Sequence, residues 1–332
     1  MMKKLILGVI GAGRIGKLHT DNLLRMPNVH VKTIADPYID KNWVESRQLT
    51  GTTDVDEIFS DKEIDAVIIL SPSTYHAEQI IAAAKAGKHI FCEKPIALDP
   101  DLIREALSVV EQHGVKLQIG FNRRFDPDFM RLQEAVQTRK IGDLYLIKIA
   151  SRDPAPPPAE YVKDSGGIFL DMTIHDFDMV RFLSGSEVEE VFAIGAVLVD
   201  PDIGKAGDVD TAIVTLKLKN GALASIDNSR QAVYGYDQRI EVFGSKGSVA
   251  ALNNTETRTI YTSPDGVISD RPLDFFLERY QRSYLAEIEA FIQTVVGDID
   301  PPVDGNDGLS ATLIGLAAKK SLELNQPVKV EQ

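Results

Sequence analysis

Two residues in the middle of the chain have the types and the spacing of a general base and its partner. Asp171 and His175 are four positions apart, so on a helix their side chains would share one face. A carboxylate beside an imidazole raises its basicity and fixes the ring nitrogen that carries the proton, as removal of a proton from a hydroxyl requires. Such a pair is also common on surfaces and can bind a metal. Because no further His or Cys lies nearby at ligand spacing, no metal is expected.

A glycine-rich stretch near the N-terminus, "LGVIGAGRIG" at residues 7–16, has the pattern G-x-G-x-x-G between an expected strand and an expected helix. Gly11 would permit the tight turn, Gly13 would let the backbone approach a pyrophosphate, and Gly16 would let helix and strand pack closely. Asp36 ends the next expected strand, where a carboxylate accepts hydrogen bonds from ribose hydroxyls and repels a 2′-phosphate. The pattern therefore predicts NAD rather than NADP, bound by Asp36 and a loop that also includes Arg14 and Ile15.

Lys94 lies in the stretch Glu93-Lys94-Pro95, directly after an expected strand. Ligands of open α/β sheets bind beyond the carboxyl ends of the strands, so Lys94 is expected where the nicotinamide lies. Its ammonium could hold a substrate hydroxyl and stabilise a developing alkoxide, and partial burial would bring its pKa toward a useful range. A lone lysine at a strand end is more often only solvated.

The first third of the chain, which carries the glycine loop, Asp36 and Lys94, alternates expected strands and helices. Apolar spacings of three and four predict helices over 15–26, 75–86 and 99–113. Short apolar runs predict buried strands over 5–10, 29–35, 66–70, 89–92 and 117–120. Such alternation predicts an α/β domain with a doubly wound parallel (Rossmann) sheet, over residues 1–121.

The rest of the chain, residues 122–332, is expected to form an α+β domain with a largely antiparallel open sheet. Alternation on both sides of Asn220-Gly221 predicts a hairpin of strands 212–219 and 222–226. Further strands are expected over 144–151, 239–243 and 248–252, helices over 129–138, 168–183, 284–296 and 309–324, and a loop over the prolines of 153–158. Its C-terminal helix, over 309–324, could return to pack on the first domain.

Composition and charge indicate which partners and which location to expect. The 332 residues carry a formal net charge of −13, which disfavours nucleic acid and anionic membranes as partners. Cys92 is the only cysteine, so no disulfide can form within the chain, and a reducing cytoplasm is expected. The apolar run at 5–10 is too short for a secretion signal, and no segment is long enough to predict a membrane span.

Several motifs occur together in a fixed order. They are "GAGRIG" at 11–16, "SPSTYHA" at 71–77, "EKP" at 93–95, "GFNRRFD" at 120–126, "RDPAPPPAEY" at 152–161 and "GGIFLDMTIHDFDMVRFL" at 166–183. Together they make the chain resemble the Gfo/Idh/MocA oxidoreductase family over essentially its whole length, and the last three look most like the inositol 2-dehydrogenase branch. The resemblance implies NAD-dependent oxidation of a ring hydroxyl of a polyol, with myo-inositol or scyllo-inositol as the substrate.

The resemblance also implies roles for particular residues. Lys94, Asp171 and His175 would form the catalytic set: the histidine takes the hydroxyl proton, the aspartate orients it and the lysine holds the reacting oxygen. Pro95 would follow a cis peptide bond, and the protein would be a tetramer or dimer joined through the sheets of the second domain. The cofactor would be lined by Ser71, Ser73, His76 and Glu93. Weaker candidates to hold the other substrate hydroxyls, each about as well explained by a structural role, are Arg124, Asp153, Thr173, Tyr234 and Tyr236.

Two other interpretations stay open at this point. One is a sugar dehydrogenase or reductase of the same family, which could use NADP, although Asp36 argues against that cofactor. The other is a regulator that senses a dinucleotide without catalysis; the presence of all three candidate catalytic residues disfavours it.

Overall fold

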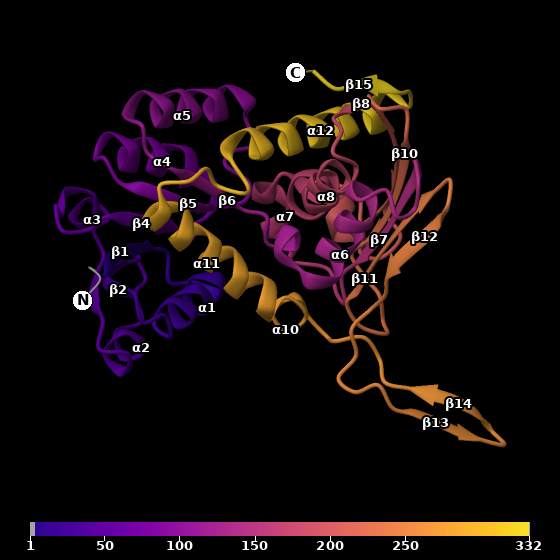
Figure 1. Ribbon diagram of the computed structural model, residues 1–332, viewed down its shortest axis with the longest axis horizontal. Coiled ribbons are helices and arrows are strands. Elements are labelled where there is room, and N and C mark those ends of the chain that lie inside the picture. The colour runs from indigo at the N-terminus through magenta and orange to yellow at the C-terminus, as the bar shows by residue number, and fades with distance from the viewer. Residues whose placement is uncertain (1–3, 332) are drawn as a thin grey trace. The chain divides into compact units, whose positions relative to one another are not determined.

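The computed structural model describes residues 4–331, which form two compact units (Figure 1). The first unit contains residues 4–122 together with Tyr284–Ser310. The second contains Arg123–Ser283 and residues 311–331. Two helices contribute residues to both units: α11 (Gln281–Gly297) and α12 (Gly305–Leu324).

The first unit is built on a parallel sheet. Within residues 4–331 this sheet has six strands in the order β3-β2-β1-β4-β5-β6, and every adjacent pair is parallel. The strands are β1 (Leu5–Ile10), β2 (Val29–Ala35), β3 (Thr50–Thr52), β4 (Ala66–Ile69), β5 (His89–Glu93) and β6 (Leu117–Gly120). Its helices are α1 (Arg14–Leu23), α2 (Lys41–Ser46), α3 (Asp56–Ser60), η1 (Ser73–Tyr75), α4 (His76–Lys85) and α5 (Pro100–His113). The Rossmann sheet expected from the sequence is confirmed.

The strand order reverses direction between β1 and β4, and this is the point where open α/β sheets bind ligands. Because the strands are parallel, their carboxyl ends meet at one edge of the sheet. Gly11 follows β1, Asp36 follows β2 and Lys94 follows β5. The fold thus brings these three predicted residues of the first unit to the same edge.

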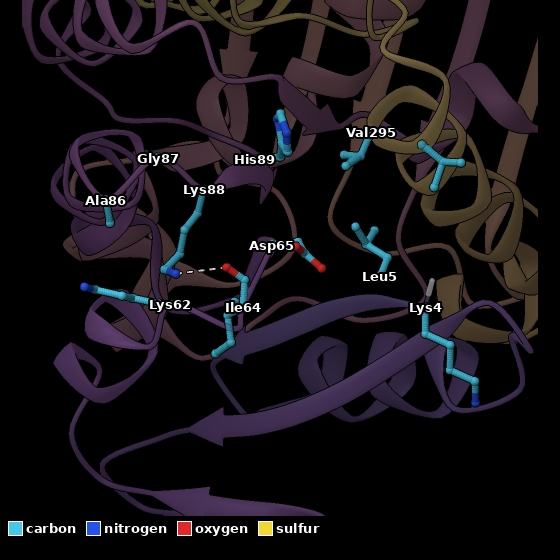
Figure 2. Close-up of a pocket in the computed structure, with 11 residues that line it drawn as sticks. Lys4, Leu5, Lys62, Ile64, Asp65, Ala86, Gly87, Lys88, His89 and Val295 are labelled. Atoms are coloured by element: carbon cyan, nitrogen blue, oxygen red, sulfur yellow. Dashed lines mark hydrogen bonds between the residues drawn. The ribbon is translucent and has the colours of Figure 1, made fainter. Parts of the chain in front are cut away.

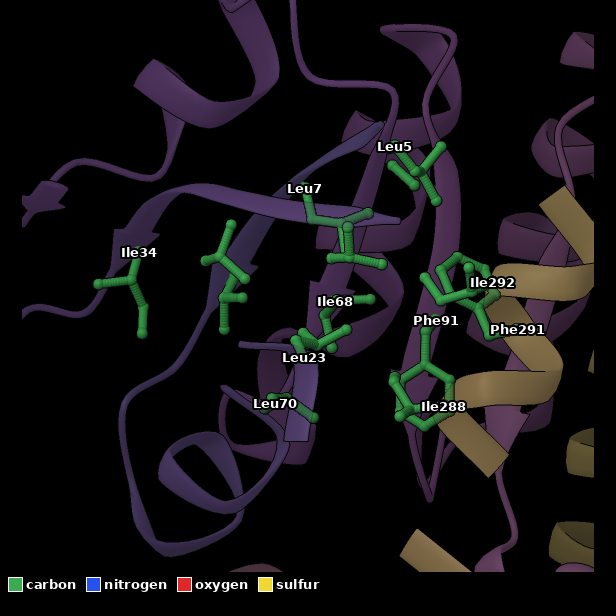
Figure 3. Close-up of a cluster of buried hydrophobic side chains, with 14 of the residues drawn as sticks. Leu5, Leu7, Leu23, Ile34, Ile68, Leu70, Phe91, Ile288, Phe291 and Ile292 are labelled. Carbon is green, nitrogen blue, oxygen red and sulfur yellow. The ribbon is translucent and has the colours of Figure 1, made fainter. Parts of the chain in front are cut away.

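Helix α11 completes the core of the first unit although it comes from the far end of the sequence. Ile288, Phe291 and Ile292 belong to the same buried cluster as Leu5 and Phe91 of the sheet (Figure 3). The rings of Phe91 and Phe291 meet edge to face, with 5.9 Å between their centroids. Residues 284–310 are expected from the sequence in the second domain, but in the structure they belong to the first unit. An amphipathic pattern shows that a helix has an apolar face, but not which sheet that face covers.

The second unit carries a mixed sheet. In the described part of the chain it has seven strands in the order β12-β11-β7-β10-β9-β8-β15; β7 and β10 are parallel and the other pairs are antiparallel. These strands are β7 (Leu144–Arg152), β8 (Val188–Ala196), β9 (Thr211–Leu218), β10 (Leu223–Ser229), β11 (Asp237–Gly244), β12 (Gly247–Ala251) and β15 (Val328–Lys329). The expected hairpin is β9–β10. The largely antiparallel sheet of the prediction is confirmed.

Helices line one face of this sheet, and a small hairpin extends away from it (Figure 1). The helical segments are η2 (Asn122–Phe125), α6 (Pro127–Gln137), α7 (Ala159–Ser165), a π-helical turn η3 (Ile168–Met172), α8 (Ile174–Ser184), α9 (Pro201–Lys205) and α10 (Phe276–Arg279). The hairpin pairs β13 (Ile260–Ser263) with β14 (Gly266–Ser269) and was not expected from the sequence.

Candidate functional site

The glycine loop after β1 is shaped by two glycines that no other residue could replace without movement. Gly11 has a φ of +101°, and a Cβ there would lie 2.5 Å from the carbonyl oxygen of Leu70. A Cβ on Gly16 would overlap the carbonyl oxygen of Gly11. A Cβ on Gly13, in contrast, would have no neighbour within 4 Å. Gly11 and Gly16 therefore serve packing, and Gly13 leaves an open backbone that a pyrophosphate could approach. Arg14 and Ile15 begin α1 directly after it.

Asp36 lies beside this loop and is part of its support. Its Oδ2 accepts a hydrogen bond from the backbone N–H of Ala12 at 2.7 Å, and its Oδ1 accepts one from Tyr38 N–H at 2.7 Å. A carboxylate oxygen has two lone pairs, so each oxygen can still accept a bond from a ribose hydroxyl. The position fits the predicted contact with the cofactor and adds a structural role that the sequence did not indicate.

Lys94 follows β5, and its peptide bond to Pro95 is cis, as the resemblance implied. The preceding residue, Glu93, contacts two groups that are distant in sequence. Its Oε1 is 3.3 Å from Nε2 of His19, which is itself 3.6 Å from Oε1 of Glu287. Both His19 and Glu287 have fully buried side chains.

Burial and the nearby Glu93 carboxylate raise the pKa of Glu287, so the neutral acid is the favoured form of that side chain. One ligand atom each from His19, Glu93 and Glu287 lie within 4.8 Å of one another, a spacing that could hold a metal ion. The sequence predicts no metal site and did not indicate this cluster. The neutral form of Glu287 relieves the repulsion between its carboxyl group and that of Glu93.

His76 is held by two carbonyl groups at the start of α4. Its Nδ1 lies 2.8 Å from the oxygen of Pro95 and its Nε2 lies 2.7 Å from the oxygen of Ser71. Burial lowers the pKa of His76. The hydroxyl of Ser71 donates to Gln79, and Ser73 begins the short helix η1. His76 thus fixes the chain segments that follow β4 and β5, which is a supporting position at the edge where the cofactor is expected.

In the second unit, Asp171 lies in a π-helical turn and not in a regular α-helix. The single helix expected over 168–183 is wrong at its beginning: η3 is followed by α8. Gly166 and Gly167 precede the turn with φ values of +85° and +78°. A Cβ on Gly167 would lie 2.7 Å from Oδ1 of Asp208, whose Oδ2 accepts a bond from Ile168 N–H at 2.8 Å. The glycine pair and the Asp208 carboxylate therefore start the turn, a form of helix often found at functional sites.

Asp171 is the centre of a polar cluster that sequence reasoning only partly found. Its Oδ1 accepts a hydrogen bond from the hydroxyl of Tyr161 at 3.0 Å, and its Oδ2 accepts one from Nη1 of Arg230 at 3.1 Å. The same Nη1 is 3.6 Å from Oδ2 of Asp153. Burial and the Asp171 carboxylate raise the pKa of Asp153 to about 6, in spite of Arg230. The second unit thus brings two predicted residues, Asp153 and Asp171, onto one guanidinium.

Arg230 and Tyr161 were not among the predicted site residues. Arg230 directly follows β10, and a charged residue at the end of an alternating strand is the only signal in the sequence that marks it. Tyr161 ends one of the motifs that carried the family resemblance and lies in α7. Desolvation of its hydroxyl and the charge of the Asp171 carboxylate raise the pKa of Tyr161 above its ordinary value, although the side chain is 51% exposed, so the hydroxyl acts as a donor.

His175 lies in the first turn of α8 and is half-buried. The two aspartates that follow it on this helix are buried and paired with arginines: Asp176 with Arg123 at 2.6 Å, and Asp178 with Arg124 at 2.6 and 2.9 Å. Arg124, a predicted substrate contact, is thus engaged in a bidentate ion pair. These pairs hold α8, and with it the position of His175.

The other predicted substrate residues lie in two parts of the second unit: Thr173 beside the π-helical turn, and Tyr234 and Tyr236 just before β11. The hydroxyl of Thr173 is fully buried, 2.8 Å from Oδ1 of Asn228 and 3.1 Å from the carbonyl oxygen of Ile168, where it supports the π-helical turn. Tyr234 donates to Asp237 at 2.6 Å and lies beside Arg152 at 3.0 Å. The ring of Tyr236 is buried edge-on against Tyr280, and burial raises the pKa of its hydroxyl.

A pocket of about 460 Å³ lies elsewhere in the first unit, at the N-terminal ends of β1, β4 and β5 (Figure 2). Leu5, Asp65 and His89 line it, as does Lys88, whose Nζ donates to the carbonyl oxygens of Asp61 and Ile64 at 2.6 and 3.0 Å. None of the predicted site residues is among the residues that line it.

The two units thus offer complementary chemistry. The first presents an open glycine backbone, a carboxylate and a lysine at one edge of a parallel sheet, as a dinucleotide and a reacting oxygen require. The second presents an imidazole and a cluster of carboxylates on a guanidinium, which can move protons and bind hydroxyls. Within residues 4–331, no helix has the length and hydrophobicity to cross a membrane.

Comparison with known proteins places the chain in a family. Residues 5–121 match the model of the Gfo/Idh/MocA oxidoreductase family with an NAD-binding Rossmann fold, and residues 129–250 match the Gfo/Idh/MocA C-terminal domain. A relative named myo-inositol 2-dehydrogenase, from Thermotoga maritima, is 51% identical over 98% of this chain and 98% of its own length.

Two solved structures are similar along their whole length. A putative myo-inositol dehydrogenase from Sinorhizobium meliloti has a TM-score of 0.95 and 44% identity, with 99% of this chain and 100% of that chain covered. A scyllo-inositol dehydrogenase from Lactobacillus casei, solved with NAD(H) and scyllo-inositol bound, has a TM-score of 0.91 and 34% identity, with 99% of each chain covered. The chain therefore belongs to the Gfo/Idh/MocA family of oxidoreductases, and residues 5–121 are its NAD-binding Rossmann domain.

Proposed function

We propose that this protein oxidises a secondary ring hydroxyl of an inositol to the ketone, with NAD as the hydride acceptor. The observation that carries the proposal is its 51% identity, over nearly the full length of both chains, to a relative named myo-inositol 2-dehydrogenase. The polar cluster around Asp171 supports it, because a polyol needs a site rich in hydrogen-bond donors and acceptors. Both myo-inositol and scyllo-inositol are candidate substrates.

In this proposal Lys94, Asp171 and His175 carry the chemistry. The imidazole of His175 accepts the proton of the reacting hydroxyl, and the carboxylate of Asp171 stabilises the imidazolium that forms. The ammonium of Lys94 donates a hydrogen bond to the same oxygen while negative charge develops on it. Bound NAD supplies the nicotinamide C4 that receives the hydride.

The remaining residues have binding roles in the proposal. The loop from Gly11 to Gly16 holds the pyrophosphate and Asp36 holds the adenosine ribose, so that NAD is preferred to NADP. Ser71, Ser73, His76 and Glu93 line the other half of the cofactor. Asp153 is the best placed of the substrate contacts, because it shares Arg230 with Asp171. Contacts from Arg124, Thr173, Tyr234 and Tyr236 remain predictions.

We also propose that the protein is a homo-oligomer, a tetramer or a dimer, that associates through the outer face of the second sheet. Strand β9 alternates buried and exposed residues, as a sheet with one open face does. Ile194, Ile213, Leu223 and Phe243 stand 44–53% exposed on this sheet, and isolated monomers seldom leave such a group of apolar residues uncovered. The cytoplasm is the proposed location, since the one cysteine is buried and unpaired.

The proposal is tested by following the absorbance of NADH while the protein is supplied with NAD and a panel of substrates. The panel contains myo-inositol, scyllo-inositol, other inositol stereoisomers and common hexoses. Turnover on an inositol with kcat/KM well above that on any hexose is expected. Faster turnover of a hexose would favour a sugar dehydrogenase, and cofactor binding without turnover of any polyol would favour a dinucleotide sensor.

A further inference from the structure

We propose that Arg230 and Tyr161 form a clamp that fixes the orientation of the Asp171 carboxylate, so that both are positioning residues for catalysis. The inference rests on the proposed function, in which Asp171 supports His175. It adds two residues, Tyr161 from α7 and Arg230 directly after β10, that would act on the proton transfer through Asp171.

The geometry of the clamp is a separate bond to each carboxylate oxygen. Tyr161 donates to Oδ1 at 3.0 Å and Arg230 donates to Oδ2 at 3.1 Å. Rotation of the carboxylate about its last side-chain bond would break both bonds together. With either bond alone, the carboxylate could pivot about the oxygen that is held, so the pair restricts Asp171 more than a single ion pair does.

Burial shows that Arg230 is not an ordinary surface partner. Its side chain is 3% exposed, and its Nε and Nη2 are buried without a hydrogen-bond partner. Leaving guanidinium donors buried and unsatisfied opposes folding, and a group of this kind calls for an explanation other than stability. Because a guanidinium does not lose its proton, Arg230 also gives Asp171 a permanent positive neighbour at any pH where the protein is folded.

The clamp also distinguishes the two aspartates that share Arg230. Asp171 makes the shorter contact, at 3.1 Å, and has the tyrosine as a second donor. Asp153 lies 3.6 Å from the same nitrogen. Asp171 is therefore the more tightly held of the two carboxylates on Arg230, and Asp153 is the more weakly held.

A double-mutant cycle on kcat tests the inference, with wild type, Tyr161→Phe, Asp171→Asn and the double variant. Tyr161→Phe removes one hydroxyl, and we expect kcat to fall roughly 10-fold, with the KM for inositol and the Kd for NADH within about two-fold of wild type. In the Asp171→Asn background the same change should cost less than two-fold, because the clamp has lost the carboxylate that it orients. A loss as large in that background as in wild type would overturn the clamp.

Variants of Arg230 provide a second test of the inference. We expect Arg230→Met to lower kcat by 10- to 100-fold, and Arg230→Lys to recover part of that loss because it restores the charge without the fork. Equal losses in Arg230→Lys and Arg230→Met, with wild-type kcat in Tyr161→Phe, would show a structural role only and overturn the inference. If Arg230→Met does not fold, the tyrosine cycle decides.

Two control variants are matched to the clamp residues. Tyr145→Phe removes the hydroxyl of an exposed tyrosine on β7, and Arg181→Lys changes an arginine on α8 that pairs with Glu187. Both should keep wild-type kcat. Absence of inositol turnover by the wild type would overturn the proposed function, and this clamp with it. Turnover by the wild type with additive losses in the cycle would overturn the clamp alone.

Discussion

The carboxylate of Asp36 accepts a hydrogen bond from the backbone N–H of Ala12 at 2.7 Å, which ties the end of β2 to the glycine loop after β1. The residue predicted to recognise the ribose therefore also holds the turn that is predicted to bind the pyrophosphate. The predicted ribose contact and the predicted pyrophosphate contact come from separate parts of the sequence motif, and both depend on the side chain of Asp36.

Replacing Asp36 with alanine should consequently affect both halves of cofactor recognition. We expect the Kd for NADH to rise at least 10-fold, because the ribose contact and the support of the loop are lost together. The Kd for NADPH should change less, since removal of the carboxylate also removes its repulsion of the 2′-phosphate. Fluorescence titration with both cofactors measures this, with Asp54→Ala, an exposed aspartate after β3, as the control. An unchanged ratio of the two Kd values would mean that another group selects the cofactor.

Replacing His175 with alanine should separate catalysis from binding. Removal of a general base lowers rates by roughly 10²- to 10⁴-fold, so kcat for inositol should fall by at least 100-fold while the Kd for NADH stays within two-fold. Steady-state kinetics and fluorescence titration give the two numbers. His113→Ala, at the exposed C-terminal end of α5, is the matched control and should behave as wild type. A variant with near-normal kcat would remove the base assignment.

Gly167→Ala tests the start of the π-helical turn. Both Gly167 and Gly207 have positive φ values, +78° and +87°, but a Cβ on Gly167 would lie 2.7 Å from Oδ1 of Asp208 and one on Gly207 would have no neighbour within 4 Å. Gly207→Ala therefore reports the cost of a positive φ where a Cβ meets no neighbour, about 1 kcal/mol. Gly167, at φ +78° and ψ −171°, adds a backbone region that essentially only glycine adopts to its contact with Asp208. We expect urea denaturation to show Gly167→Ala to be less stable than Gly207→Ala, and kcat to fall only in Gly167→Ala. Equal effects would show that the contact with Asp208 does not matter.

Periodicity in the sequence predicted most of the long elements of both sheets, but the nine-residue strand β8 (Val188–Ala196) was not predicted. The five strands and three helices expected in the first third are present within a few residues of their predicted ends. Thr50–Thr52, which forms β3, was not predicted because three residues carry too little pattern. The π-helical turn was not predicted for a different reason: the spacing of apolar residues over 168–183 fits a helix, and the change of register comes from Gly166, Gly167 and the distant Asp208.

In the candidate site, too, residues marked by a local pattern could be predicted, whereas contacts between residues far apart in the sequence could not. Gly11, Asp36 and Lys94 could be found because each follows a strand of the parallel sheet, and the carboxyl ends of such strands are where ligands bind. Arg230 could not be found as the partner of Asp171, because 59 residues separate them and only the pairing of β10 in the sheet brings them together. Likewise, the contact between His19 and Glu287 depends on α11 returning to the first unit.

The proposed oligomer can be tested on the open face of the second sheet. Ile213 is 50% exposed there and lies opposite Ile194 on the neighbouring strand. A lysine in place of Ile213 would put a charge into an apolar interface, so we expect the assembly to dissociate into smaller species in light scattering after size-exclusion chromatography. Leu102→Lys, at a residue 48% exposed on α5, is the control and should leave the mass unchanged. A wild-type protein that elutes as a monomer would contradict the proposed assembly.

The raised pKa of Asp153 makes a prediction about stability as a function of pH. Its pKa is about 6 in the folded protein, against an ordinary value of 3.8 for an unperturbed aspartate, so between these values the folded state binds more protons than the unfolded chain. The contribution of Asp153 to the free energy of unfolding is therefore greatest below pH 3.8 and falls as the pH rises to about 6. The full difference is at most about 3 kcal/mol, since each pKa unit corresponds to about 1.36 kcal/mol.

Asp153→Asn removes this titration while it keeps the size of the side chain. We expect the wild type to lose stability relative to Asp153→Asn as the pH is raised from 4.5 to 7, with no further relative change between pH 7 and 8. Urea denaturation of both proteins across this range measures the difference, and the titration of groups that do not interact with Asp153 cancels in the comparison. If the difference is constant with pH, or if the wild type gains stability over the same interval, then Arg230 dominates and Asp153 is an ordinary ionised carboxylate.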